Sequence, residues 1–310
     1  MKKIFNSIIL IIILFSSCKS YTNSQNTSDY TQKNYIEFTD NLGNQIKVSD
    51  SEHIIVATSS FADVWQLAGG TVYATTSDAF ENLYLPDNVN NIGSLHSPNA
   101  ELIISLNPSL VVLSSDVSGH LELYNQLNAA GITVAYLSIQ IFDDYLNILD
   151  IFTDITGRKD LYESNGLIIQ NEINTIIEKA KDKPSPKILL LRVGAGKVTA
   201  RNADNSAGAM LKDLGCINIT DNQKNLLDEL SMEAIIKEDP DYIFAVNMGN
   251  SDSDNEKTLE NALFSNPAWT ELSAVKNENY IILPKDLFHL KPNNRWNEAY
   301  IFLWEILYEN

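Results

Sequence analysis

Short apolar runs rich in isoleucine, leucine and valine alternate along this chain with stretches of helical periodicity, and this alternation restricts its possible folds most. The runs are apolar at almost every position, as expected for strands of a parallel sheet that is covered on both faces. Strands that alternate with helices predict an α/β architecture. We expect a hairpin at 35–50 and buried strands at 54–58, 71–75, 110–114, 133–138, 187–193, 242–246 and 280–283.

A short pattern, E-x-I-I-x-x-x-P, occurs once in each half of the chain, at 101–108 and at 233–240. Each copy ends in a proline, which terminates a helix, and a predicted strand follows it. One copy in each half predicts two similar α/β lobes. A common strand–helix unit without shared function would give the same match.

Between the two halves, residues 158–183 have the apolar period of one long helix. Gly157 precedes this stretch, and two prolines follow it and prevent its continuation. We therefore predict an N-terminal α/β lobe at 35–157, one long rigid linking helix at 158–183 and a C-terminal α/β lobe at 184–310.

The N-terminus has the features of an export signal. Lys2 and Lys3 precede an apolar run at 8–15, and Ser16, Ser17 and Cys18 follow it. The run is too short for a spanning helix, which predicts a cleaved signal. Cys18 after small residues resembles a lipobox, so we predict a lipoprotein signal peptide at 1–17, lipidation at Cys18 and a flexible tether at 18–34. An ordinary signal with an incidental cysteine is the alternative. Either way the protein is exported, and lipidation would anchor it at the periplasmic face or outer surface of the cell membrane.

Charge and motif content exclude several functions. The chain has 22 basic and 40 acidic residues, a formal charge of -18, which argues against a nucleic-acid partner. The glycine-containing stretch at 191–199 fits neither a Walker motif nor a dinucleotide fingerprint, and no G-x-S-x-G elbow occurs. The histidines form no pair or cluster with zinc-ligand spacing. We therefore predict no enzyme, no direct protein–metal site and no cofactor.

A series of motifs resembles one known family from Tyr35 to Tyr308. They are, in order, FTDNLGNQIKV, GSLHSPNAELIISLNPSLVVL, GITVAYL, DITGR, AGAMLKDLGCINI, LSMEAIIKEDPDYIF and PAWTELSAVKNENYIILP, ending in KPNNRWNEAY. Together with the lipobox they resemble the solute-binding lipoproteins of ABC importers in the helical-backbone class. The resemblance implies two Rossmann-like lobes joined by one long helix, with a ligand in the cleft between them. It implies an iron chelate as ligand, a ferric siderophore first and then haem or a corrinoid such as cobalamin. It also implies delivery to an ABC permease dimer with its ATPase subunits, and we expect a monomer.

The resemblance places two docking carboxylates on the repeated pattern. Glu101 and Glu233 match the positions, one per lobe, that meet arginines of the permease. Rim ion pairs of this kind orient a complex more than they tighten it. The alternative is structural, because a glutamate also stabilises a helix N-terminus, and Ser97-Pro98 and Ser231 stand just upstream as capping signals.

Loops that follow the strands should line the cleft, since ligands of α/β proteins bind beyond the carboxyl ends of strands. These loops offer aromatic and cationic side chains, which suit a large, partly planar or anionic chelate. Trp65 is expected to belong to the core and Trp304 to pack in the last helix, and for Arg295 a helix-start contact stays open. The candidate cleft residues are Ser60, Phe61, Asp78, Phe80, His96, Arg192, Lys197, Arg201, Phe288, His289 and Arg295.

Two other functions stay open at this point. One is a surface lipoprotein hydrolase on a doubly wound scaffold, because fold does not fix function. The other is a ligand sensor that takes no part in transport. Substrate turnover would favour the first, and uptake that survives charge reversal at Glu101 and Glu233 would favour the second.

Overall fold

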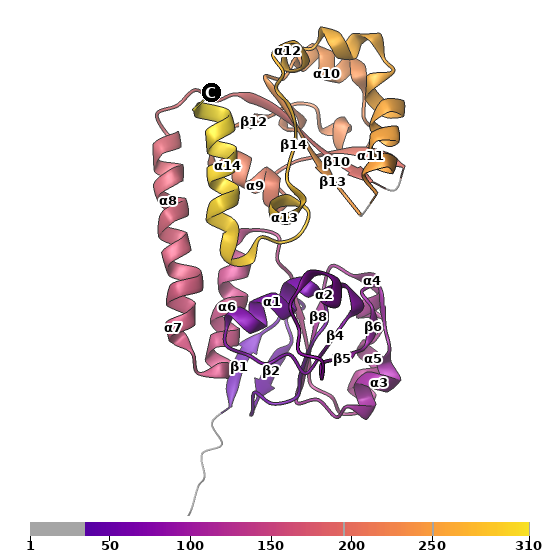
Figure 1. Cartoon of the computed structure of the whole chain (residues 1–310), viewed down its shortest axis with the longest axis vertical. Coiled ribbons are helices and arrows are strands. Elements are labelled where there is room, and N and C mark those ends of the chain that lie inside the picture. Colours follow the sequence, from indigo (N-terminus) through magenta and orange to yellow (C-terminus); the bar gives the residue numbers. More distant parts are fainter. Residues whose placement is uncertain (1–34, 195, 250, 310) are drawn as a thin grey trace, which may run out of the picture. The chain divides into compact units, whose positions relative to one another are not determined.

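The computed structural model describes residues 35–194, 196–249 and 251–309 (Figure 1). The predicted signal peptide at 1–17, Cys18 and the predicted tether at 18–34 lie outside the described residues. Tyr35–Asn310 forms a single contact unit, within which two lobes are each built on their own sheet. In the described ranges, every helix is too short or too polar to cross a lipid bilayer.

The first lobe is built on a parallel sheet. Its strands are β3 (Ile54–Val56), β4 (Ala74–Thr75), β5 (Asn90–Asn91), β8 (Leu110–Ser114) and β9 (Val134–Leu137), and its helices are α1 (Ser59–Leu67), α2 (Ser77–Asn82), α3 (Ala100–Ser105), α4 (Ser118–Leu121), α5 (Tyr124–Ala129) and α6 (Phe142–Thr156). The strand order is β5-β4-β3-β8-β9, with parallel pairing throughout. Ile54 and Val56 face the core under α1 and α6, whereas Ile55 faces the core under α3 and α5. Both faces are covered, which is why the strands are apolar almost throughout.

Two small hairpins complete this lobe. They are β1 (Ile36–Thr39) with β2 (Gln45–Val48), and β6 (Gly93–Ser94) with β7 (Ser97–Pro98). Asp40 closes the first hairpin, because its Oδ1 accepts hydrogen bonds from the backbone N–H groups of Leu42 and Asn44. Its Oδ2 accepts a further hydrogen bond of 3.0 Å from the Tyr136 backbone N–H, which ties the hairpin to β9.

The second lobe has a mixed sheet with strand order β11-β10-β13-β14, and β12 also pairs with β10. Its strands are β10 (Lys187–Gly194), β11 (Lys197–Arg201), β12 (Ile217–Asn218), β13 (Tyr242–Asn247) and β14 (Tyr280–Ile282), and its helices are α9 (Ser206–Asp213), α10 (Met232–Glu238), α11 (Asp252–Leu259), α12 (Ser273–Lys276), α13 (Lys285–Phe288) and α14 (Trp296–Tyr308). Only β11 runs antiparallel to its neighbour in this sheet of the described chain. Leu189 and Leu191 face α10 and α11, whereas Ile188 and Leu190 face α9 and α14.

The stretch between the lobes is helical from Lys159 to Ala180. It consists of α7 (Lys159–Tyr162), a π-helical turn at Glu163–Leu167 and α8 (Ile168–Ala180). Within the π turn, the Asn165 carbonyl oxygen accepts a 2.6 Å hydrogen bond from the Tyr145 hydroxyl. The turn, which the sequence does not predict, thereby fastens this helix to α6 of the first lobe.

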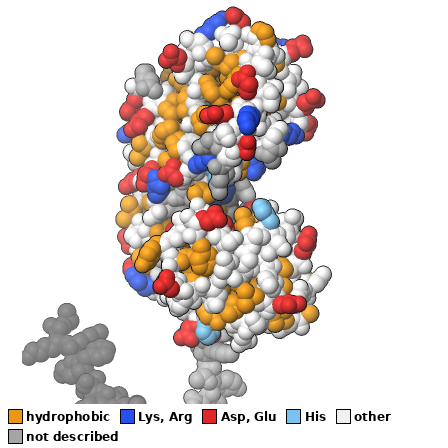
Figure 2. Space-filling model, turned by 45° about the vertical axis from the view of Figure 1, so that its right-hand side comes forward, with side chains coloured by type: hydrophobic (Ala, Val, Ile, Leu, Met, Phe, Trp, Pro, Cys, Tyr) orange, Lys and Arg blue, Asp and Glu red, His pale blue; other side chains and the backbone are white. Residues whose placement is uncertain are grey.

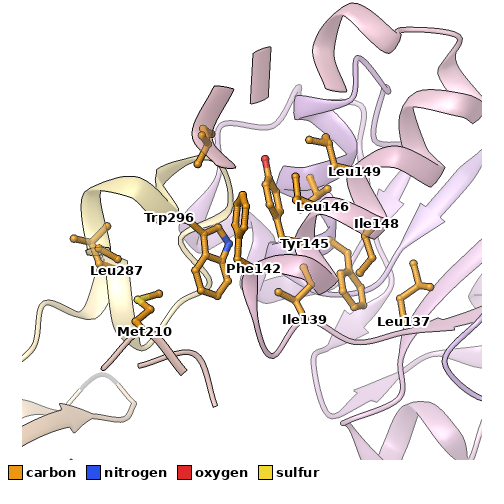
Figure 3. Close-up of a cluster of buried hydrophobic side chains, with 14 of the residues drawn as sticks. Leu137, Ile139, Phe142, Tyr145, Leu146, Ile148, Leu149, Met210, Leu287 and Trp296 are labelled. Carbon is orange, nitrogen blue, oxygen red and sulfur yellow. The ribbon is translucent and has the colours of Figure 1, made fainter. Parts of the chain in front are cut away.

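One hydrophobic core runs through both lobes. It includes Val56 and Phe142 of the first lobe and Leu190, Phe244 and Trp296 of the second. Figure 3 shows Trp296 with Phe142 and Tyr145 on one side and Met210 on the other. The Trp296 and Phe142 rings meet edge to face, with their centroids 5.8 Å apart. The lobes are therefore packed on each other as well as joined by a helix.

Candidate functional site in the cleft between the lobes

Each sheet reverses its strand order at one point, and these two points define the candidate site. In the first lobe the chain proceeds outwards from β3 through β4 to β5 and then returns to β8 on the other side. In the second lobe the reversal lies between β10 and β13. Ligands of open α/β sheets bind beyond the carboxyl ends of strands at such switch points. Figure 2 shows the surface hollowed between the two lobes.

The loop after β3 begins the rim of the first lobe and is strained. Thr58 has a φ of 127°, which is unfavourable for a β-branched residue, and its side chain caps α1 by accepting from the Phe61 N–H. Asp78 connects two helix starts, because its carboxylate accepts from the Ser59 N–H at 2.7 Å and from the Thr76 hydroxyl at 2.6 Å. Both oxygens of Asp78 therefore already have protein partners.

The remaining candidates of the first lobe differ in exposure. Phe61 is 4% exposed and belongs to the core, so it offers almost no surface to a ligand. The hydroxyl of Ser60 is also buried. Phe80 is 40% exposed, and His96 is exposed between β6 and β7. Phe80 and His96 are thus the predicted residues of this lobe that are accessible.

Two residues of α4, Gly119 and His120, fix the position of the loop that carries His96. The His120 ring is fully buried, accepts from the Ser114 N–H at Nδ1 and donates from Nε2 to the Leu95 carbonyl oxygen at 2.7 Å. Burial lowers the pKa of His120, so its neutral form is favoured. Next to it, Gly119 leaves room for the His96 backbone, since a Cβ at Gly119 would lie 1.9 Å from the His96 carbonyl oxygen. His120 is thus a structural residue that holds the rim.

The rim of the second lobe is cationic. Arg192 lies near the end of β10, beside Thr199 of β11 and Val246 of β13, and its side chain is exposed. Partial loss of hydration and the nearby Arg201 lower the pKa of Arg192. Within the described residues the side chains of Arg192 and the exposed Lys197 have no hydrogen-bond or ion-pair partner, whereas Arg201 pairs with Asp204 at 3.3 Å.

Lys291 joins this group and was missed by the sequence reasoning. It is half-buried between α13 and α14, and burial lowers its pKa. Asp116 and Asp144 of the first lobe raise that pKa and Arg192 lowers it, so charges of both lobes act on Lys291. Asp116 and Asp144 already accept hydrogen bonds from their own lobe, and neither forms an ion pair with Lys291. The KPNNRW segment was part of the motif series, but nothing in its sequence distinguished Lys291 from its neighbours.

The last three candidates come from the segment around α13. Phe288 is 5% exposed and packs in the core. His289 is half-buried, with Nδ1 3.1 Å from the Met248 sulfur, and burial, Lys285 and Arg192 lower its pKa. Arg295 pairs with Asp286 at 3.0 Å and with Glu298 at 2.8 Å, so its charge is already matched at the start of α14.

The two proposed docking glutamates occupy equivalent places in the two lobes. Glu101 is exposed in the first turn of α3, and Glu233 is exposed in the first turn of α10. Ser231 caps α10, but Asn99 caps α3 by accepting from the Leu102 N–H at 3.0 Å. The cap expected at Ser97-Pro98 is therefore wrong, because those residues form β7 instead.

Two hollows of the described chain lie away from the switch points. One, of about 410 Å³, is lined by His53, Trp65 and Gly70 at the opposite end of the first sheet. A second of about 320 Å³ lies beside α8 and includes Tyr300 and Asp213. The described part of the chain holds no group of three or more histidine, cysteine, aspartate or glutamate side chains able to ligate a metal ion.

Comparison with known proteins identifies the fold family. The family model described as Periplasmic binding protein matches residues 54–287. The chain belongs to this family. It is a family of binding proteins, and its two-lobed α/β fold agrees with the architecture predicted from the sequence.

Individual relatives support the same assignment. The Fe(3+)-citrate-binding protein YfmC of Bacillus subtilis is 25% identical over 288 residues, which cover 88% of this chain and 86% of YfmC. The putative ABC transporter substrate-binding lipoprotein YhfQ of the same organism is 22% identical over 314 residues, 94% of this chain and 93% of YhfQ. The triscatecholate siderophore binding protein FeuA of B. subtilis, solved with ferri-bacillibactin, has a TM-score of 0.66 at 18% identity, covering 89% of this chain and 99% of FeuA. The likeness to FeuA shows a shared fold, and the two Rossmann-like lobes joined by a helix are confirmed.

Proposed function

We propose that this chain is the solute-binding lipoprotein of an ABC importer and that its cargo is an iron chelate. A ferric siderophore is the first candidate, followed by haem and cobalamin. Membership of the binding-protein family supports this assignment, as do the names of YfmC and YhfQ. No observation favours a hydrolase or a sensor, and we infer no catalytic role.

The observation that carries the proposal is the unmatched positive charge at the second switch point. Arg192 is exposed and has no partner among the described residues, and Lys291 lies near it without an ion pair. Two cations held near each other repel unless an anion lies between them. A guanidinium donates paired hydrogen bonds to carboxylate and other oxygen anions. Groups of this kind also coordinate the iron in many ferric chelates. The arrangement therefore supports a chelate that presents oxygen anions.

The overall charge of the chain does not oppose such a ligand at the site. Its formal charge is -18, but salt screens exposed charges over a distance of about 10 Å. An anion that has entered the cleft interacts mainly with the nearest side chains. At the second switch point the nearest exposed cations are Arg192 and Lys197, whereas Lys291 is partly balanced by Asp116 and Asp144.

Delivery requires an anchor and a docking surface. Lipidation at Cys18 would hold the protein outside the cytoplasm, at the periplasmic face or the outer surface of the membrane. Glu101 and Glu233, exposed at equivalent helix starts, would orient the loaded protein, as a monomer, on a permease dimer whose ATPase subunits drive release.

A titration panel tests the proposal. The protein without residues 1–34 is titrated with hydroxamate, catecholate and citrate-type ferric chelates, haem and cobalamin, with free Zn²⁺ and Mn²⁺ as controls. We expect saturable one-to-one binding of one chelate with a Kd below about 1 μM. Tryptophan fluorescence gives the first signal and calorimetry checks it. If neither method detects binding of any chelate in the panel, the proposed cargo is contradicted.

A further inference from the structure

A short segment before α14 contacts helix α1 of the first lobe. Asn293, in a 3-10 turn at Asn293–Arg295, donates from Nδ2 to the Asp63 Oδ2 at 2.7 Å and to the Ser60 carbonyl oxygen at 3.2 Å. Both acceptors lie in α1, which immediately follows the first switch point. We name this group of Asn293, Ser60 and Asp63 the inter-lobe latch. It joins residues 230 positions apart in the sequence.

Burial and backbone conformation hold the Asn293 side chain in this contact. Its side chain is 1% exposed, and its backbone has a φ of 48°, a conformation that asparagine tolerates better than most residues. Trp296, one turn further on, is fully buried against Phe142 of the first lobe. Two independent contacts therefore fix the start of α14 to the first lobe.

The latch also leaves polar groups unmatched. The Asn293 Oδ1 and the Ser60 hydroxyl are both buried, and neither has a hydrogen-bond partner among the described residues. Burial raises the pKa of Asp63, while the hydrogen bond from Asn293 lowers it. An apolar contact would avoid these costs. Buried polar groups without partners cost stability, and such costs are typical of functional sites.

Two of the residues discussed for the cleft, His289 and Lys291, stand directly before the latch. Lys291 is two positions before Asn293, and His289 is four positions before it. Upstream, the segment is held by α13, whose Phe288 is in the core. The carboxylates of Asp116 and Asp144 in the first lobe raise the pKa of Lys291 and the guanidinium of Arg192 in the second lowers it, so charges of both lobes act on this ammonium group. The place of this ammonium group therefore depends on where the latch fixes the chain.

We propose that Asn293 is a positioning residue, which through its hydrogen bonds to Asp63 and Ser60 holds the 289–292 segment across the cleft and aims Lys291 at the ligand. Without the latch, the segment is held only at α13 and α14, and Lys291 moves among several positions. The latch itself does not contact the ligand. Its role in affinity rests on the proposed function, but its effect on Lys291 does not.

The first test needs no ligand. In the protein of residues 35–310, brief acetylation followed by mass spectrometry measures the reactivity of Lys291, and amide exchange reports on residues 289–295. Asn293→Gly removes the side chain but accepts the positive φ, so it should raise Lys291 reactivity and local exchange severalfold. Asp63→Leu breaks the same bond from the other lobe and should have the same effect. Asn294→Gly is the matched control, and it should leave both readouts near wild type.

The second test uses the chelate found in the titration panel. Asn293→Gly should weaken its binding by up to about tenfold, because a Lys291 that is no longer positioned loses its charge-assisted hydrogen bond to the ligand. In a Lys291→Met background the same change should have almost no further effect, because the residue being positioned is gone. A purely structural role for Asn293 would weaken binding equally in both backgrounds.

The proposal is overturned if folded Asn293→Gly and folded Asp63→Leu both show wild-type Lys291 reactivity and exchange. It is also overturned if the binding losses at Asn293 and Lys291 simply add. If wild type binds no chelate of the panel, the proposed cargo fails, but the reactivity and exchange measurements still decide whether the latch fixes Lys291.

Discussion

Replacement of Trp296 by alanine tests whether the two lobes share one core. The indole is fully buried, and its edge-to-face contact with Phe142 crosses from the second lobe to the first. Figure 3 shows it between Phe142 and Met210, so its removal leaves a hole between lobes as well as within one. Truncation of a fully buried tryptophan costs about 3–5 kcal/mol.

Urea unfolding, followed by far-UV circular dichroism, measures this cost. For a chain of this size the dependence of the unfolding free energy on urea is about 3 kcal/mol per molar. The unfolding midpoint of Trp296→Ala should therefore fall by about 1–1.7 M. Because the core is continuous, wild type should unfold in one transition despite its two lobes.

Trp304 on the same helix provides the matched control. It is half-buried, and its Nε1 donates to Glu309 at 3.0 Å at the end of α14. Trp304→Ala should cost about 1 kcal/mol, because its ring packs at the surface, 5.0 Å from that of Tyr308. Equal midpoints for the two variants, or two separate transitions in wild type, would refute the idea of a core shared by the lobes.

Three other changes have defined expectations. Gly119→Ala places a methyl group against the His96 carbonyl oxygen, at 1.9 Å before relaxation, and should cost about 1–3 kcal/mol by calorimetry; an unchanged melting temperature would contradict this contact. Burial lowers the pKa of His120 from its usual 6.5, so the unfolded chain binds more protons than the folded chain below about pH 6.5. Stability should therefore fall as the pH drops from about 6.5 towards the lower folded pKa, and less so in His120→Asn; equal acid sensitivity of the two proteins would count against this mechanism. Glu101→Lys with Glu233→Lys should abolish uptake of labelled chelate by cells while leaving its Kd unchanged, and normal uptake would remove the docking assignment.

Much of the fold could be predicted from the sequence because its signals are local. Apolar runs such as 110–114 and 242–246 coincide closely with β8 and β13. The run at 71–75 is a strand only at Ala74–Thr75, and the Thr71 carbonyl oxygen before it accepts a 3.0 Å hydrogen bond from Trp65 Nε1. Trp65 is fully buried, which confirms its expected place in the core. The π turn at Glu163–Leu167 was not predictable, because its cause is packing against α6.

The site was less predictable because its residues meet only in three dimensions. Of the predicted cleft residues, Arg192 in β10 and Lys197 in β11 are exposed cations, whereas Phe61 and Phe288 lie in the core. Lys291 and Asn293 were missed. Their roles depend on contacts with the first lobe, more than 140 residues away in the sequence, and no local pattern encodes such contacts.

The most direct test of the central claim compares wild type with Arg192→Gln in titrations of an anionic ferric chelate at two salt concentrations. Arg192 is an exposed guanidinium whose side chain has no partner among the described residues, so it should carry the recognition of oxygen anions. We predict submicromolar binding by wild type, at least about tenfold weaker binding by Arg192→Gln, and a smaller salt dependence in the variant. Equal affinity and equal salt dependence of the two proteins would contradict the claim that cleft cations capture the chelate.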